Sequence, residues 1–387
     1  MGVIVSNYSV TNPPDNPAAY PEIKDLAIDA KKTNSFNFYA NYFTNVANSK
    51  GALYAFKLLG FAPLPPMIDT HLMGHVVGDI LYKQMGINGI KYCTQDFRNA
   101  CSHSIVINAF LQKGEKAIPE IEKACHAAPG GSGAYTMCFH GLGHGILAYV
   151  NYDFPKTDAL CKKFGTEQYN YREYIECMGG AVMEIISGGG HSHDIWQIQH
   201  NKYLNSSDPL SLCRQSFFND QTKSICYVYI TPYLFEAAGM DLGNPDPKYY
   251  PKAFSYCNQM PDSDSVDKDI CFAGFGKEFI VIANNRDTRN MGSMTKDQLK
   301  LVYQWCSMAQ TYDGVGACIQ SALESLFWGG ENNPAASFNL CEIIPNQYQD
   351  RCYGALAGNI SYFLTDKNAR APLCSKLPEK YQADCNR

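Results

Sequence analysis

The segment Cys271-Phe-Ala-Gly-Phe-Gly-Lys-Glu278 decides the fold class, because close variants of it recur along the chain. In each variant a cysteine follows a polar stretch and precedes an apolar run with glycine, as in Cys177-Met-Gly-Gly-Ala-Val-Met-Glu184. These cysteines recur at intervals of 33 to 49 residues. Such intervals are typical of helix–turn–helix repeats, in which neighbouring hairpins bury a shared core.

The 16 cysteines of the chain fall into eight couples of neighbours. No CxxC motif occurs, so the signature of zinc ribbons and thioredoxin-type sites is missing. We expect eight local disulfides, hence an oxidising compartment and a secreted, extracellular or periplasmic protein. The alternative is a set of reduced, buried cysteines at a repeat position. The couples are Cys93/Cys101, Cys125/Cys138, Cys161/Cys177, Cys213/Cys226, Cys257/Cys271, Cys306/Cys318, Cys341/Cys352 and Cys374/Cys385.

The pattern between the cysteines predicts an all-α fold. Apolar residues such as Phe279, Ile282 and Ala283 follow helical spacing, and runs of Asn, Gly, Pro and Asp separate the segments. We expect disulfide-stapled αα-hairpin repeats that form either an open solenoid or a closed α/α toroid. Three regions are predicted: a linker or stalk over 1–35, a histidine-rich half over 36–205, and a repeat half without histidines over 206–387.

Composition excludes some classes of protein. The formal net charge of −5 argues against a nucleic-acid partner. Only 18% of the residues are charged, below the roughly 25% usual for soluble domains. No apolar run reaches the roughly 18 to 20 residues of a transmembrane helix. Residues 1–10 lack the features of a signal peptide, so we expect a leader to have been removed. The later repeats are expected to be scaffold, or a surface for a protein partner or a second copy of the chain.

The nine histidines all lie within the first 200 residues. His71-Leu-Met-Gly-His75 and His140-Gly-Leu-Gly-His144 share the pattern HxxGH, and His103 and His140 each lie two residues after a cysteine. Histidines four residues apart lie on one helix face, about 6 Å from each other, so each pair can offer two imidazoles to one ion. If this position were required only for folding, every repeat should hold a similar residue there, but the later repeats hold no histidine. The concentration of histidines therefore predicts a metal site.

The surroundings of the two pairs predict how they are held. We expect the first pair on a helix that begins near Asp69 and ends near Gly86. Glycines interrupt the second pair at a cost of roughly 1 kcal/mol each, so we expect another backbone or a bound group close to them. The apolar stripe expected beside the first pair is Ile68, Leu72, Val76 and Ile80; the glycines are Gly141, Gly143 and Gly145.

Two sets of three imidazoles can be assembled, for a mononuclear or dinuclear site. An imidazole shell suits copper, or alternatively zinc or iron, better than Mg²⁺ or Ca²⁺. Two HxxxH pairs with isolated third histidines resemble, over a few residues, the half-sites of type-3 copper proteins such as tyrosinases; the surrounding chain does not follow those families. One set is His71, His75 and His103; the other is His140 and His144 with His191 or His193.

These observations predict a secreted metalloenzyme, and we favour a copper-dependent oxidoreductase acting on a small molecule. Glu184 and Asp79 are candidate catalytic residues, with ligand, ring-orienting or ion-pair roles as alternatives. A zinc-dependent hydrolase that activates a bound water is the second hypothesis. The third is a non-enzymatic extracellular binding or assembly protein with a structural metal site.

Overall fold

A computed structural model of the chain describes residues 12–188, 193–329, 334–364 and 366–387. Every regular element within these residues is a helix, and none of them lies in a β-strand, so the all-α prediction is confirmed. The chain divides into two compact units. The first unit comprises Met1–Glu184 and Asn285–Arg289, and the second comprises Ile185–Asn284 and Asn290–Arg387.

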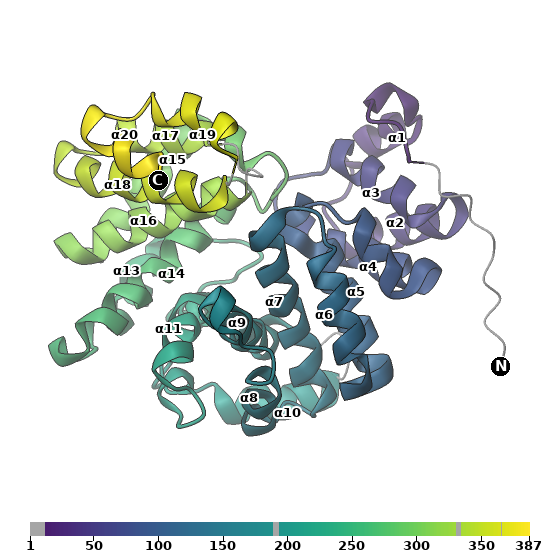
Figure 1. The fold of residues 1–387 in the computed structure, drawn as a ribbon, viewed down its shortest axis with the longest axis horizontal. Coiled ribbons are helices and arrows are strands. Elements are labelled where there is room, and N and C mark those ends of the chain that lie inside the picture. The colour runs from purple at the N-terminus through teal and green to yellow at the C-terminus, as the bar shows by residue number, and fades with distance from the viewer. Residues whose placement is uncertain (1–11, 189–192, 330–333, 365) are drawn as a thin grey trace. The chain divides into compact units, whose positions relative to one another are not determined.

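The first unit contains α1 to α8 and most of α9. In it α4, α5 and α7 lie side by side, and α2 and α3 pack on α4 (Figure 1). Part of the segment expected to be a linker is helical, because α1 belongs to this unit and buries Leu26. The bounds are α1 (Glu22–Asp29), α2 (Phe36–Lys50), α3 (Ala52–Phe61), α4 (Thr70–Met85), α5 (Ala100–Lys113), α6 (Ile118–His126), α7 (Gly131–Tyr149), α8 (Phe154–Cys161) and α9 (Arg172–Ser187).

The second unit contains the remaining helices, and five of them pack on one another in chain order. Helix α14 packs between α11 and α16, α16 packs on α18, and α18 packs on α20. The bounds are α10 (His193–Tyr203), α11 (Asp220–Tyr229), α12 (Thr231–Ala238), α13 (Tyr250–Asn258), α14 (Ser265–Ala283), α15 (Lys296–Cys306), α16 (Tyr312–Gly329), α17 (Ala335–Ile343), α18 (Asn346–Phe363), α19 (Lys367–Cys374) and α20 (Glu379–Cys385).

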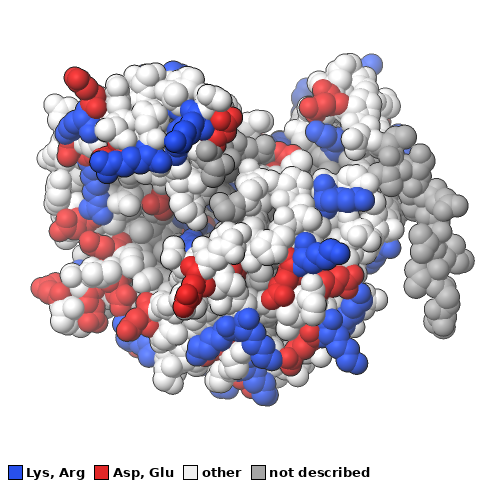
Figure 2. Space-filling model, in the orientation of Figure 1, with Lys and Arg blue, Asp and Glu red and all other residues white. Residues whose placement is uncertain are grey.

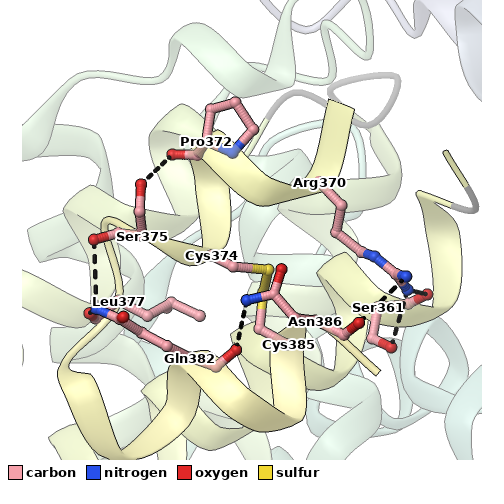
Figure 3. The surroundings of a disulfide bond; sticks show 9 residues. All are labelled: Ser361, Arg370, Pro372, Cys374, Ser375, Leu377, Gln382, Cys385 and Asn386. Carbon is pink, nitrogen blue, oxygen red and sulfur yellow. Dashed lines mark hydrogen bonds between the residues drawn. A yellow bond between two sulfur atoms is a disulfide. The ribbon is translucent and has the colours of Figure 1, made fainter. Parts of the chain in front are cut away.

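All sixteen cysteines are paired, and the eight disulfides have the predicted partners. The cysteines also share a register, because five of them lie six residues after the first residue of their helix: Cys226, Cys271, Cys318, Cys352 and Cys385. Figure 3 shows the last bridge, which joins the C-terminal residue of α19 to that of α20. Beside it the buried Arg370 side chain donates to the carbonyls of Ser361 and Asn386.

The short segment Asn285–Arg289 belongs to the first unit, where it holds the chain before α4. The Met67 amide donates to the Asn285 carbonyl over 2.9 Å, and the Thr288 amide donates to Thr70 Oγ1 over 2.8 Å. The Arg289 guanidinium donates to the carbonyl oxygens of Leu59 and Ala62, at 2.8 and 2.6 Å. These bonds satisfy backbone groups in a stretch that has no helix of its own.

The surface carries charges of both signs. On the face shown in Figure 2, lysine and arginine side chains are interspersed with aspartate and glutamate among wide uncharged areas, in keeping with the low charged fraction of the sequence. Over the part of the chain that the structure describes, no helix combines the length and the apolar character needed to cross a membrane.

Candidate metal centre

Helix α4 carries the first histidine pair, and its ends are those expected from the sequence. The Asp69 side chain caps the helix by accepting from the Leu72 amide over 3.0 Å, and Gly86 ends it with a φ of 60°. Of the predicted apolar stripe, Ile68 and Ile80 are buried as expected, and Leu72 is not. Leu72 is 47% exposed, whereas Met73 and Val77 are fully buried.

Glycines bring the histidine-bearing helices close together. A Cβ at Gly78 of α4 would lie 2.6 Å from the Ser104 Cβ of α5, and one at Gly141 of α7 would lie 2.6 Å from the His103 Cα of α5. A Cβ at Gly143 would overlap the carbonyl oxygen of Cys177 in α9. The expectation that another backbone lies close to the glycines of α7 is therefore confirmed. This close packing places the imidazoles of α4, α5 and α7 in one cluster.

The hydrogen bonds of His71 and His75 define which ring nitrogens carry protons. His71 Nδ1 lies 2.6 Å from the Phe97 carbonyl oxygen, which can only accept, so Nδ1 is the donor. Ser104 Oγ uses its single proton on the His75 carbonyl, so His75 Nδ1, 3.0 Å away, donates to Ser104 Oγ. In the neutral rings both Nε2 atoms consequently carry lone pairs. These two atoms face each other at 3.2 Å.

His103 completes a group of three. One ring nitrogen from each of His71, His75 and His103 lies within 4.8 Å of the other two. The His103 side chain is 2% exposed, and both of its ring nitrogens are buried without a hydrogen-bond partner. Burial, reinforced by the nearby His140 and His75 imidazoles, holds the pKa of His103 well below its usual value. His103 is therefore neutral near pH 7, the form that binds metal.

A strained turn supplies the carbonyl that holds His71. Phe97, Arg98 and Asn99, just before α5, all adopt left-handed backbone angles, with φ of 56°, 53° and 63°. Left-handed conformations cost residues other than glycine roughly 1 kcal/mol or more each. Strain of this kind persists where the surrounding structure imposes it, often at functional sites. Here the turn aims the Phe97 carbonyl at Nδ1 of His71.

The second histidine pair is backed by buried carboxylates of α9. His144 Nδ1 lies 3.1 Å from Glu184 Oε2, and the Tyr152 hydroxyl donates to the other Glu184 oxygen over 3.1 Å. His140 Nδ1 lies 3.5 Å from Glu176 Oε2. The His140 ring centroid is 5.3 Å from that of His144 and 5.5 Å from that of His103. The cluster thus continues from α4 through α5 to α7.

The structure brings five of the seven predicted ligands together. His191 lies outside the described residues. His193 belongs to the second unit, where its exposed ring stacks on Trp196 with centroids 5.5 Å apart. Of the two candidate catalytic residues, Glu184 has both oxygens engaged and orients His144, and Asp79 accepts a hydrogen bond from the Asn108 amide over 2.8 Å. The five clustered histidines are His71, His75, His103, His140 and His144.

Sequence reasoning missed the groups that position the imidazoles. Glu176 was not predicted. It lies eight residues before Glu184, with Gly180 midway, and residues at intervals of four lie on one face of α9. That spacing was the available signal. Met183, whose sulfur lies 3.2 Å from His140 Nε2, and Ser104 carry no comparable pattern.

Comparisons with known proteins return no match: neither a protein-family model, nor a curated protein, nor a solved structure is similar to this chain.

Proposed function

We propose that the first unit is a copper-dependent oxidoreductase acting on a small molecule, with its metal ion held by His71, His75 and His103. The observation that carries this proposal is the 3.2 Å approach of the Nε2 atoms of His71 and His75. Both Nδ1 atoms are tied as donors, so two lone pairs point at each other. Such an arrangement is unfavourable unless a cation or a proton lies between them.

The distance also fits two ligands of one ion. Two imidazole nitrogens bound at about 2.0 Å to a tetrahedral ion are about 3.3 Å apart. His103 would supply the third nitrogen, and its buried ring lacks any other partner. Three protein ligands leave a coordination position open, as catalytic metal sites require.

The donor set favours copper over the alternatives. The three grouped ligands are neutral imidazoles with no carboxylate among them, and such sites bind Cu²⁺ more tightly than other divalent first-row ions. The zinc hydrolase hypothesis needs a carboxylate that accepts a proton from bound water. Glu184 is already occupied by His144 and Tyr152, which weakens its case as that base.

Elemental analysis together with oxygen-consumption assays tests this proposal. We expect about one equivalent of copper or more in the purified full-length chain, and O₂ uptake with small phenols or amines. His103→Ala should lose one equivalent and the activity while keeping its helical circular dichroism. His126→Ala is the matched control, because His126 lies on α6 and stacks on Tyr135. A folded protein that takes up no metal would overturn the proposal; zinc in place of copper would replace it with the hydrolase.

We also propose that the helices form αα-hairpin repeats and that the protein is secreted. The shared cysteine register and the chain-order packing of α11, α14, α16, α18 and α20 support the repeats. Eight disulfides support an oxidising compartment, where such bridges persist. Mass spectrometry of protein from its native source, alkylated before reduction, tests the second point. Free thiols at these cysteines would contradict it.

A further inference from the structure

We propose that His140, His144 and Met183 form a second metal position, selective for Cu(I), between α7 and α9. It uses none of the three ligands of the first position. The proposal starts from a contact: His140 Nε2 lies 3.2 Å from Met183 Sδ. Imidazole nitrogen and thioether sulfur together are a donor set that selects Cu(I) over Zn²⁺, Mg²⁺ and Ca²⁺.

Each imidazole of this position is supported from behind by a buried glutamate. His144 Nδ1 is 3.1 Å from Glu184, and His140 Nδ1 is 3.5 Å from Glu176; both glutamates are less than 5% exposed. The other Glu176 oxygen, Oε1, accepts a hydrogen bond from the Arg172 guanidinium over 2.6 Å. A carboxylate behind an imidazole fixes the ring and strengthens it as a ligand.

The contacts of Glu184 determine which ring nitrogen of His144 carries the lone pair. The Tyr152 hydroxyl donates to Glu184 Oε1, and His144 Nδ1 donates to Oε2. His144 Nε2 therefore carries the lone pair of the neutral ring. An N–H···S hydrogen bond from His140 to Met183 would explain that single contact. It would leave unexplained why His144 has a buried carboxylate and phenol committed to orienting it.

The pattern matches that of the first position. His71, His75 and His144 are each tied at Nδ1, by a carbonyl, a hydroxyl and a carboxylate respectively. Metal-binding histidines characteristically have such a partner on the nitrogen opposite the metal. The neighbouring positions differ in chemistry: imidazole alone on α4 and α5, imidazole with thioether on α7 and α9.

Silver is the probe for this position, because Ag⁺ is a soft, redox-inert substitute for Cu(I). Metal-free full-length protein is titrated with Ag⁺ by native mass spectrometry and calorimetry. We expect two equivalents for the natural chain and one for Met183→Leu. Met178→Leu is the matched control, since Met178 is buried on the same helix and lies outside the cluster, and it should keep both equivalents. His144→Gln, a second variant, should lose the same equivalent as Met183→Leu.

The outcomes separate the two positions. If His103→Ala loses one equivalent while Met183→Leu and Met178→Leu bind equally, the second position does not exist and the first position, on which the proposed function rests, is unaffected. If Met183→Leu loses an equivalent that His103→Ala retains, this inference holds whether or not the first position binds. If His144→Gln and Met183→Leu, both folded by circular dichroism, bind as many Ag⁺ ions as the natural chain, the inference is overturned.

Discussion

The Nε2 atoms of His71 and His75 lie 3.2 Å apart with both Nδ1 atoms committed as donors, to the Phe97 carbonyl and to Ser104 Oγ. The two rings thus turn their unprotonated edges toward each other in a half-buried site. This relationship is the basis of the proposed metal centre, and the groups that maintain it lie on α5 and on the turn before it.

Ser104→Ala should weaken metal binding at the first position without unfolding the protein. The variant removes the acceptor that fixes the His75 ring, and loss of such a partner costs roughly 10- to 100-fold in metal affinity. Competition with a chelator of known affinity measures the change. Ser102→Ala is the control, because Ser102 is buried on the same helix and donates to the Asn99 carbonyl. Equal affinities for the two variants would contradict the role given to Ser104.

Gly141→Ala should destabilise the first unit by about 1 to 3 kcal/mol, the usual cost of overpacking. Its new methyl group would lie 2.6 Å from the His103 Cα and force α5 and α7 apart. Gly358→Ala on α18 should instead stabilise by about 1 kcal/mol, since nothing lies within 4 Å of its Cβ. Urea unfolding followed by circular dichroism compares the two. A neutral Gly141→Ala would show that close helix packing is not what gathers the imidazoles.

Acid should weaken the attachment of the segment Asn285–Arg289 to the residues just before α4. Burial alone would raise the pKa of Asp287, but hydrogen bonds from Arg289 hold this pKa below its usual value. A lowered folded-state pKa contributes stability that is present above the unfolded value of about 3.9 and is lost as pH falls through the folded value. Asp287→Asn should therefore destabilise the protein at pH 7. The difference from the natural chain should shrink below about pH 4; a constant difference from pH 7 to pH 2 would contradict this account.

The disulfides should differ in their effect on the metal centre. Replacing Cys374 and Cys385 by serine removes a bridge in the second unit and should cost about 3 kcal/mol in the chain-entropy model, with metal content unchanged. Replacing Cys93 and Cys101 should lower metal affinity, because Cys101 lies two residues before His103. Chelator competition on both double variants measures this. Equal metal affinity in the two double variants would show that the Cys93–Cys101 disulfide does not support the metal centre.

The disulfide pairing and helical class could be predicted because they depend on local spacing. Cysteines 8 to 16 residues apart have few alternative partners, and every couple formed as expected. The HxxGH motifs located four of the clustered histidines for the same reason, since i and i+4 share a helix face.

The rest depends on packing between helices, which local spacing does not encode. The buried face of α4 was predicted only in part: Ile80 is buried as expected, Leu72 is exposed, and the close contact with α5 is made through Gly78. Glu176 was missed because its partner His140 is 36 residues away on another helix.

Pulsed electron paramagnetic resonance of the Cu²⁺-loaded protein tests the central claim most directly, because it counts coordinated imidazoles through their remote ring nitrogens. At one equivalent of Cu²⁺ the account predicts three imidazoles in the natural chain and two or fewer in folded His103→Gln, with His126→Gln unchanged. A spectrum with no imidazole, or one that His103→Gln leaves unaltered, would contradict it.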